Sequence, residues 1–325
     1  MKLALISFTD KGVLLAASLA GKLTAQGHTV TCREPGVPLK DWTAQFFPTS
    51  DGLIFIGASG IAVRAIAPHM QDKARDPAVV VMDEGGKFAV SLLSGHLGGA
   101  NALAEELAKL TGAVPVITTA TDSRGLFAVD SWAKRQGCFV REPERIKGVS
   151  ARILAGQTVS VYSEIPITGE PPEGVVLSPG PAQVEVTVRP QGNALHIIPP
   201  VGVLGVGCKK GTSAENLEAA LRALDIAPQA ICKVCSINLK AHEPGLLAFC
   251  QAHGWELQTF PAADLAAVSG DFTPSPFVAQ VTGVDNVCER AAMLGSGGVL
   301  YLKKQAGNGV TIALVLKPYT MDWSW

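Results

Sequence analysis

Short apolar runs alternate with amphipathic stretches along most of the 325-residue chain. Continuous apolar runs of about four to eight residues are typical of buried strands, and apolar residues spaced three or four apart are typical of helices on a sheet. The first such run, at 2–8, is followed by a helical pattern at 13–23. The alternation predicts a multidomain α/β fold, in which each unit has three α/β/α layers around a parallel or mixed sheet.

The same alternation continues through the first third of the chain. Strands are predicted at 28–32, 52–57, 79–83, 87–93 and 114–119. The runs 79–83 and 87–93 are separated by Glu84, Gly85 and Gly86, which predicts a hairpin. Helices are predicted after residues 60 and 99, because apolar side chains there recur at helical spacing.

Changes in the pattern of strands, helices and turn residues along the chain suggest three domains, at 1–125, 126–200 and 201–325. The middle segment has helical patterns at 126–136 and 143–155 and turn-rich loops, and we interpret 189–200 as a linker. The third part opens with a strand at 201–207. Its first helix is predicted to begin at Thr212, which has the capping-box spacing to Glu215.

Composition narrows the range of partners. The formal net charge is −1, from 27 basic and 28 acidic residues, and no run of like charges occurs, so we expect no nucleic-acid partner. The N-terminal apolar run is too short for a signal peptide or a membrane span, so we expect a cytoplasmic protein with no membrane partner. Seven cysteines are expected to be reduced, and Cys232 and Cys235 are interpreted as strand residues, not as a metal or redox site.

Three turns of small residues follow predicted strands and precede helices, at 57–60, 94–99 and 205–213. Glycines let a ligand approach the backbone, and the first N–H groups of a helix attract anions. If these turns face one crevice at the carboxyl ends of the strands, they suit a ligand with several carboxylates. The alternative for each is a plain tight connection. The turn at 205–213 matches neither the dinucleotide nor the P-loop spacing of glycines.

His96 is the ionisable residue of the second turn. The pattern is not a nucleophile elbow, because Leu92 and His96 stand where glycines are required around Ser94. His96 is therefore a candidate general base or acid, and the alternative is a structural histidine. The groups predicted to assist it are the N–H groups of Gly98 and Gly99, the Asn101 amide, and the carboxylates of Asp83 and Asp122. The alternatives are a solvated hairpin for Asp83 and a helix cap for Asp122.

A second set of residues is predicted to bind the substrate. Its members are small, hydroxyl-bearing or charged side chains at strand ends and in the glycine turns. They are Gly57, Ser59, Gly60, Arg64, Thr119, Thr121, Gly207, Lys209, Lys210, Gly211, Thr212, Ser213, Lys240 and Glu243. For Glu243 the alternative is a capping role. No metal site and no cofactor are predicted.

The order of these motifs resembles one family. The stretches LIFIGASGIAVRAIAPHM, DEGGKFAVSLLSGHLGGANALAEELA and PVITTATD, followed by LGVGCKKGTSAENLEAAL, KAHEPGLLAF and SPFVAQV, resemble the cobalt-precorrin 5A hydrolase family (CbiG) of anaerobic cobalamin biosynthesis. The resemblance covers both ends of the chain and weakens between 126 and 200.

The resemblance implies a reaction and a substrate. The substrate would be a cobalt-bearing tetrapyrrole with a δ-lactone, which water opens with release of acetaldehyde to give cobalt-precorrin 5B. No cofactor would be needed, because the cobalt belongs to the substrate. Neighbouring enzymes of the pathway would be the partners. The alternative is a non-enzymatic tetrapyrrole carrier, which would use the glycine turns and lysines without needing His96.

Overall fold

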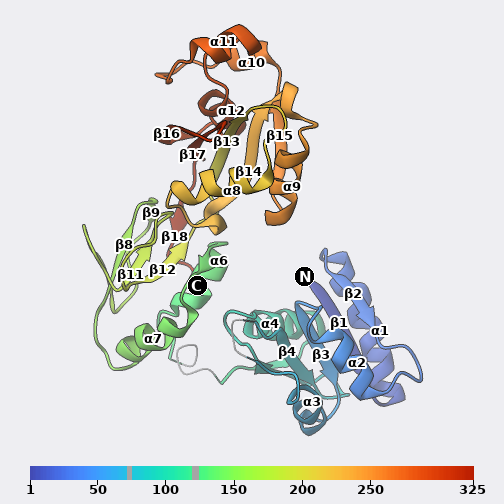
Figure 1. Cartoon of the computed structure of the whole chain (residues 1–325). Coiled ribbons are helices and arrows are strands. Elements are labelled where there is room, and N and C mark those ends of the chain that lie inside the picture. Colours follow the sequence, from blue (N-terminus) through green and yellow to red (C-terminus); the bar gives the residue numbers. More distant parts are fainter. Residues whose placement is uncertain (72–74, 119–123) are drawn as a thin grey trace. The chain divides into compact units, whose positions relative to one another are not determined.

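The structure is a computed structural model that describes residues 1–71, 75–118 and 124–325 (Figure 1). Helices alternate with strands, and the sheets are parallel or mixed, which confirms the predicted multidomain α/β class. The chain divides into two compact units. Unit 1 consists of 1–134, 146–157 and 325, and unit 2 consists of 135–145 and 158–324. The three predicted domain ranges remain a prediction.

Unit 1 is built on a six-stranded sheet of order β2-β1-β3-β4-β5-β6. Its strands are β1 (Lys2–Ser7), β2 (Thr29–Cys32), β3 (Gly52–Ile56), β4 (Ala78–Met82), β5 (Phe88–Leu93) and β6 (Val114–Val116). All neighbours are parallel except β4 and β5, which form the predicted antiparallel hairpin. Since β5 runs against β4 and β6 is parallel to β5, the last two strands end at the edge where β1, β3 and β4 begin.

Helices cover both faces of this sheet. They are α1 (Asp10–Ala25), α2 (Leu39–Phe46), α3 (Ser59–Ile66) and α4 (Ala100–Thr111). Later in the chain come α6 (Val129–Arg135) and α7 (Ile146–Leu154). One apolar core joins alternate residues of the strands, such as Leu3 and Leu5, to α1 and α4. The opposite core joins Ala4 and Ile6 to α2 and α3. The three layers follow from the two-residue alternation of side chains along each strand.

The second sheet corrects the interpretation of 189–200 as a linker. The order β10-β8-β11-β12-β7 places a strand, β12 (Leu195–Ile198), inside that range. The remaining strands are β7 (Phe139–Val140), β8 (Val159–Ser163), β10 (Val175–Leu177) and β11 (Val184–Val186). All four β12 residues are buried, between a parallel neighbour and an antiparallel one. The linker prediction was wrong because the flanking prolines and Gly192 end a short strand rather than interrupt a loop.

The third sheet has the order β15-β14-β13-β17-β16. Its strands are β13 (Gly202–Cys208), β14 (Ile231–Ile237), β15 (Glu256–Phe260), β16 (Val299–Gly307) and β17 (Val310–Leu316). The accompanying helices are α8 (Ala214–Ala223), α9 (Pro244–His253), α10 (Ala262–Ala267), α11 (Pro276–Thr282) and α12 (Cys288–Ser296). The predicted start of α8 was one residue early: Ser213, not Thr212, caps it by accepting the N–H of Asn216, because Thr212 instead donates its hydroxyl to the Lys209 carbonyl.

Gly205 shows why β13 is rich in glycine. A Cβ built on Gly205 would lie 1.7 Å from the Cys288 carbonyl oxygen, so only glycine lets α12 pack this closely on the strand. A Cβ on Gly202 would instead meet Ile231 and Leu314, and one on Gly207 would meet Thr311, so these two glycines fit neighbouring strands. A two-stranded sheet completes unit 2, in which β18 (Met321–Asp322) pairs in parallel with β9 (Ile167–Thr168).

Candidate functional site

The segment from Ser94 to Asn101 connects β5 to α4 by a turn whose backbone is tightly constrained. Ser94 adopts a left-handed backbone with φ of 57°, and Gly99, the residue before the helix, has φ of 91°. The N–H of Ala100 donates to the Ser94 carbonyl at 3.1 Å, and the N–H of Asn101 donates to the Gly95 carbonyl at 3.0 Å. These two helix N–H groups are therefore used by the turn itself.

Both predicted oxyanion-site glycines are constrained, Gly98 by the space around it and Gly99 by its left-handed backbone with φ of 91°. A Cβ on Gly98 would lie 2.3 Å from the Ser94 Cβ and 2.8 Å from its carbonyl oxygen. A Cβ on Gly99 would lie 2.1 Å from the Nζ of Lys134. Asn101 accepts the Ser91 hydroxyl at 2.6 Å, which joins the helix start to β5. The sequence SGHLGGAN thus specifies one compact turn.

His96 is paired with a buried carboxylate that the sequence analysis did not name. Its Nδ1 lies 3.1 Å from both carboxylate oxygens of Asp130, which is on α6 and is only 4% exposed. If Nδ1 carries the proton donated to Asp130, the basic lone pair of the neutral imidazole lies on Nε2. The arrangement is that of an oriented general base.

Lys134 lies one helical turn after Asp130 on the same face of α6. Its Nζ donates to the Leu97 carbonyl at 3.0 Å, so both side chains hold the same turn. Burial lowers the pKa of Lys134, and the Asp51 carboxylate opposes that shift. The sequence held one signal for these two residues. Asp130 and Lys134 are four apart, which places both charged side chains on one face of a mostly apolar helix.

Asp83 lies far from His96, at the opposite edge of the sheet. Burial raises the pKa of the Asp83 carboxyl, but hydrogen bonds from the N–H groups of Phe88, Lys87 and Gly85 lower it more, and the net pKa is below the ordinary value. These bonds build the β4–β5 turn. The expectation that Asp83 orients the imidazole is therefore replaced by the observed contact with Asp130. Asp122, Thr119 and Thr121 lie outside the described residues.

The GASG turn is also at the edge opposite His96. It follows β3, whose carboxyl end meets the end of β4, while β5 runs the other way. The two turns therefore lie at opposite edges of the sheet, because the antiparallel strand reverses the connection. Ser59 and Gly60 begin α3, Gly57 donates its N–H to the Met82 carbonyl, and Arg64 donates to the Gly60 carbonyl at 3.4 Å.

In unit 2 the turn after β13 is tied to the turn after β14. The Glu243 carboxylate accepts the Nζ of Lys240 at 2.8 Å and the N–H of Gly211 at 2.7 Å. The hydrogen bond from Lys240, then that from Gly211, lower the pKa of Glu243 below its ordinary value. Lys209 donates its N–H to the Gly309 carbonyl, so the same turn contacts the β16–β17 hairpin.

These turns border a cavity of about 1150 Å³ in unit 2. Of the predicted binding residues, it is lined by Gly207, Lys209, Lys210, Gly211, Lys240 and Glu243. Thr212 and Ser213 are not in the lining, because the Thr212 hydroxyl bonds the Lys209 carbonyl and Ser213 caps α8. Sequence reasoning missed the apolar lining, which includes Leu239, Phe277 and Val281. Lysines outnumber carboxylates in the lining, so the cavity favours an anionic ligand with apolar surface.

The cysteine pair at 232 and 235 lies on β14. The register of β14 with β13 shifts beside Cys232, and both cysteine side chains pack against one apolar cluster on the same face of the sheet. Burial raises the pKa of the Cys235 thiol to about 12, which suits a core residue. Within the ranges that the structure describes, no three His, Cys, Asp or Glu side chains gather as metal ligands, and no helix has the length and apolar composition to cross a membrane.

Comparisons with known proteins agree with the order of the motifs. Residues 41–122 match the family described as Cobalamin synthesis G N-terminal, residues 127–187 match the Cobalamin biosynthesis central region, and residues 202–315 match the Cobalamin synthesis G C-terminus. A proposed homolog of cobalamin biosynthesis protein G from Sulfolobus solfataricus, whose structure is solved, aligns over 97% of each chain, with 19% identity and a TM-score of 0.45.

Two curated relatives are similar over most of the chain. The cobalt-precorrin-5A hydrolase of Salmonella typhimurium is 37% identical, over 96% of this chain and 97% of the relative. The cobalt-precorrin-5A hydrolase of Priestia megaterium is 35% identical, over 84% of this chain and 80% of the relative. With its three matched regions in order, the chain belongs to the cobalamin synthesis G (CbiG) family, which includes the cobalt-precorrin-5A hydrolases.

Proposed function

We propose that this chain is a hydrolase of cobalamin biosynthesis, which opens the δ-lactone of cobalt-precorrin 5A and releases acetaldehyde to give cobalt-precorrin 5B. The observation that carries the catalytic part is the pairing of His96 with buried Asp130 in a glycine turn of a CbiG-family chain. The substrate brings its own cobalt, and it comes from and passes to neighbouring enzymes of the pathway in the cytoplasm.

His96 acts first as a general base. Its Nε2 takes a proton from water, and the resulting hydroxide adds to the lactone carbonyl carbon. Asp130 holds the Nδ1 proton and stabilises the imidazolium that forms. The N–H groups of Gly98 and Gly99 stabilise the developing oxyanion, and the rigid turn around them keeps that geometry fixed.

Collapse of the tetrahedral intermediate breaks the acyl C–O bond. The freed acetate remains on the macrocycle, and the former lactone oxygen becomes the hydroxyl of a two-carbon substituent. Removal of that hydroxyl proton breaks the carbon–carbon bond to the ring. Acetaldehyde leaves, and the electron pair passes into the macrocycle, which takes up a proton. No net oxidation or reduction occurs.

An anaerobic assay with cobalt-precorrin 5A tests the proposal. We expect acetaldehyde in equal amount to the product, together with the matching loss of mass from the macrocycle. The His96→Ala variant should lower kcat by about 10²- to 10⁴-fold, since general base catalysis contributes about this much. Asp130→Asn should lower kcat by more than about tenfold, because the imidazole loses the group that fixes its tautomer.

His69→Ala is the matched control, because it removes an imidazole of unit 1 that contacts the Phe47 ring rather than a carboxylate. Its kcat should equal that of the wild-type chain. A folded His96→Ala variant with wild-type turnover would remove His96 from the mechanism. A chain that binds the substrate and yields no acetaldehyde would be a carrier, and the proposed activity would be wrong.

A further inference from the structure

The segment from Thr273 to Asn286 projects from the third sheet as an arm that carries α11. None of the α11 residues is buried, and Phe277 and Val281, four residues apart, are 66% and 62% exposed. Apolar side chains at this spacing lie on the same face of a helix. Both line the cavity of about 1150 Å³. The arm therefore presents an apolar face to the cavity. Among the described residues, no other part of the chain buries this face.

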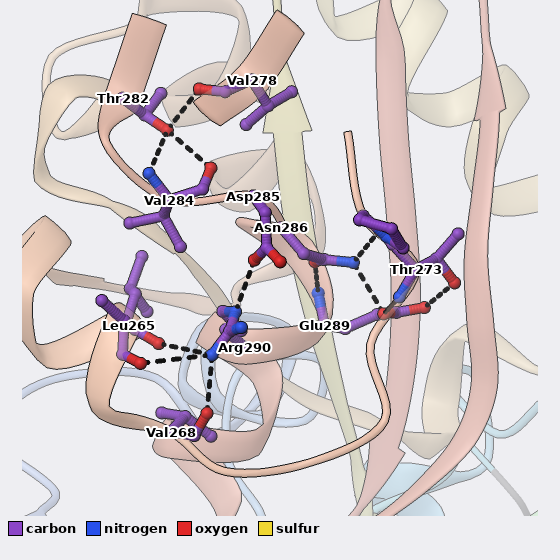
Figure 2. Close-up of polar contacts among 12 residues, drawn as sticks. Leu265, Val268, Thr273, Val278, Thr282, Val284, Asp285, Asn286, Glu289 and Arg290 are labelled. Carbon is purple, nitrogen blue, oxygen red and sulfur yellow. Dashed lines mark hydrogen bonds and ion pairs between the residues drawn. The ribbon is translucent and has the colours of Figure 1, made fainter. Parts of the chain in front are cut away.

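The base of this arm is held rigidly, as Figure 2 shows. The fully buried carboxylate of Glu289 on α12 accepts the N–H of Thr273 at 2.7 Å and the side-chain amide of Asn286 at 2.6 Å. These two residues are the two ends of the arm. Ser275 also donates its N–H to the Asp285 carbonyl at 2.8 Å, which closes the neck. The exposed apolar face is therefore positioned by buried polar groups.

A second side chain of α12 fixes the flank of the arm. Arg290 pairs with Asp285 at 3.0 Å and donates to the Val268 carbonyl at 2.6 Å (Figure 2). Lys304 donates its Nζ to the Thr273 carbonyl at 2.7 Å. These bonds join the arm to α12, to β16 and to the end of α10. The position of α11 on unit 2 is therefore fixed by side chains outside the arm.

The charges around the cavity define the ligand that fits the apolar face. Lys209, Lys210, Lys240 and Lys304 line it, against the carboxylates Glu243 and Asp285. Lys240 and Asp285 are already paired within the chain. A ligand that matches both features has a broad apolar ring and several peripheral carboxylates. Its apolar surface would cover Phe277 and Val281, and its carboxylates would meet Lys209 and Lys210.

We propose that the α11 arm is a contact plate for the ring face of a polycarboxylate tetrapyrrole, with Phe277 and Val281 as the contact residues. Identification of this ligand as the substrate rests on the proposed function. Glu289 is a positioning residue that fixes the arm. The plate supplies salt-independent affinity, because it acts by burying apolar surface, whereas the lysines supply salt-dependent affinity.

The test is a fluorescence titration of the full chain with uroporphyrin, a metal-free porphyrin octacarboxylate. Val281→Ser and Phe277→Ser should each weaken binding by about tenfold, and the loss should persist in about 1 M salt, where charge interactions are screened. The double variant Lys209→Ala with Lys210→Ala should weaken binding at low salt only. Both α11 residues are exposed, so the melting temperature should not change.

Val299→Ser is the matched control, because Val299 is 75% exposed on β16 and lies outside the cavity lining. Its affinity for uroporphyrin should equal that of the wild-type chain. Equal affinities for Val281→Ser and Val299→Ser, or no binding by the wild-type chain, would overturn the proposal. This readout does not depend on turnover, so a lack of acetaldehyde would count against the proposed function alone.

Discussion

At the residue scale, Gly98 has the strictest requirement in the His96 turn. Its Cα faces the Ser94 Cβ and carbonyl oxygen, so an added methyl group would have to displace backbone. Gly99 adds a left-handed backbone, which glycine adopts without strain. The turn places His96 beside Asp130 only while this packing holds. The chemistry of the imidazole therefore depends on residues that have no side chain.

Gly98→Ala should destabilise unit 1 by about 1–3 kcal/mol, the usual range for overpacking a close contact. It should also lower kcat, because the displaced turn moves His96 away from Asp130. Chemical denaturation and the acetaldehyde assay measure the two effects. Gly148→Ala is the control, since Gly148 lies within α7 and a Cβ added there would meet nothing within 4 Å. That change should be neutral or stabilising by up to about 1 kcal/mol.

At the element scale, Glu243 connects the β13–α8 turn to the β14–α9 turn through Gly211 and Lys240. Because its pKa is lowered in the folded chain, its ionised form stabilises that chain. This contribution is complete above the unfolded pKa, near 4.5, and is lost as the pH falls through the lower folded pKa. The link between the two cavity turns should therefore weaken in acid.

Glu243→Gln should lower the melting temperature at pH 7, and the difference from the wild-type chain should shrink between about pH 5 and pH 3. Thermal denaturation across that pH range measures it. Glu170→Gln, on an exposed loop, is the control and should show no such convergence. A difference that stays constant down to pH 3 would mean that Glu243 acts by packing rather than by charge.

The elements themselves were largely predictable, because apolar runs and helical spacing report burial directly. Strands β1, β3, β4, β5 and β13 lie where the pattern placed them. Helix α2 was passed over because it has only eight residues after Pro38, although its Trp42 is buried. Strand β12 was hidden between prolines and glycine. Local patterns identify elements, but they do not show which short ones a sheet will bury.

The candidate site was less predictable than the elements. His96 was identified from its turn, but Asp130 is 34 residues away and is joined to it only by tertiary packing. The direction of β5 decided which strand ends share an edge, and so separated Asp83 and the GASG turn from His96. Several lysines of the cavity were predicted, whereas Phe277 and Val281 were not, because exposed apolar residues on a short helix give no signal in sequence.

At the scale of the whole molecule, the chain is not a simple series of segments. Unit 2 combines 135–145 with 158–324, and its two-stranded sheet pairs Met321 with Ile167. Gln136 donates to the Asp322 carboxylate at 2.9 Å, and Thr168 donates to the Met321 carbonyl at 3.1 Å. Met321 and Trp323 are buried. The last residues therefore help to hold the middle of the chain.

Deletion of residues 320–325 should destabilise unit 2 by about 3–5 kcal/mol, because two large apolar side chains lose their buried positions. Thermal denaturation measures the loss. A control chain with a short Gly-Ser tail after Trp325 keeps every native residue and should melt with the wild-type chain. If the shortened chain had the same melting temperature as the wild-type chain, the β18–β9 pairing would not stabilise unit 2.

The β18–β9 pairing also bears on how the protein is made. During synthesis, β9 leaves the ribosome about 150 residues before its partner, a separation set by the pairing of Thr168 with Asp322. Until then, β9 has no strand paired with its edge, and the apolar surface that Met321 and Trp323 later cover is exposed to solvent. If translation stops before β18, or if β18 is cleaved off, the edge of β9 stays unpaired. We expect such a shortened chain to be bound by chaperones or degraded by proteases, and not to act as an enzyme.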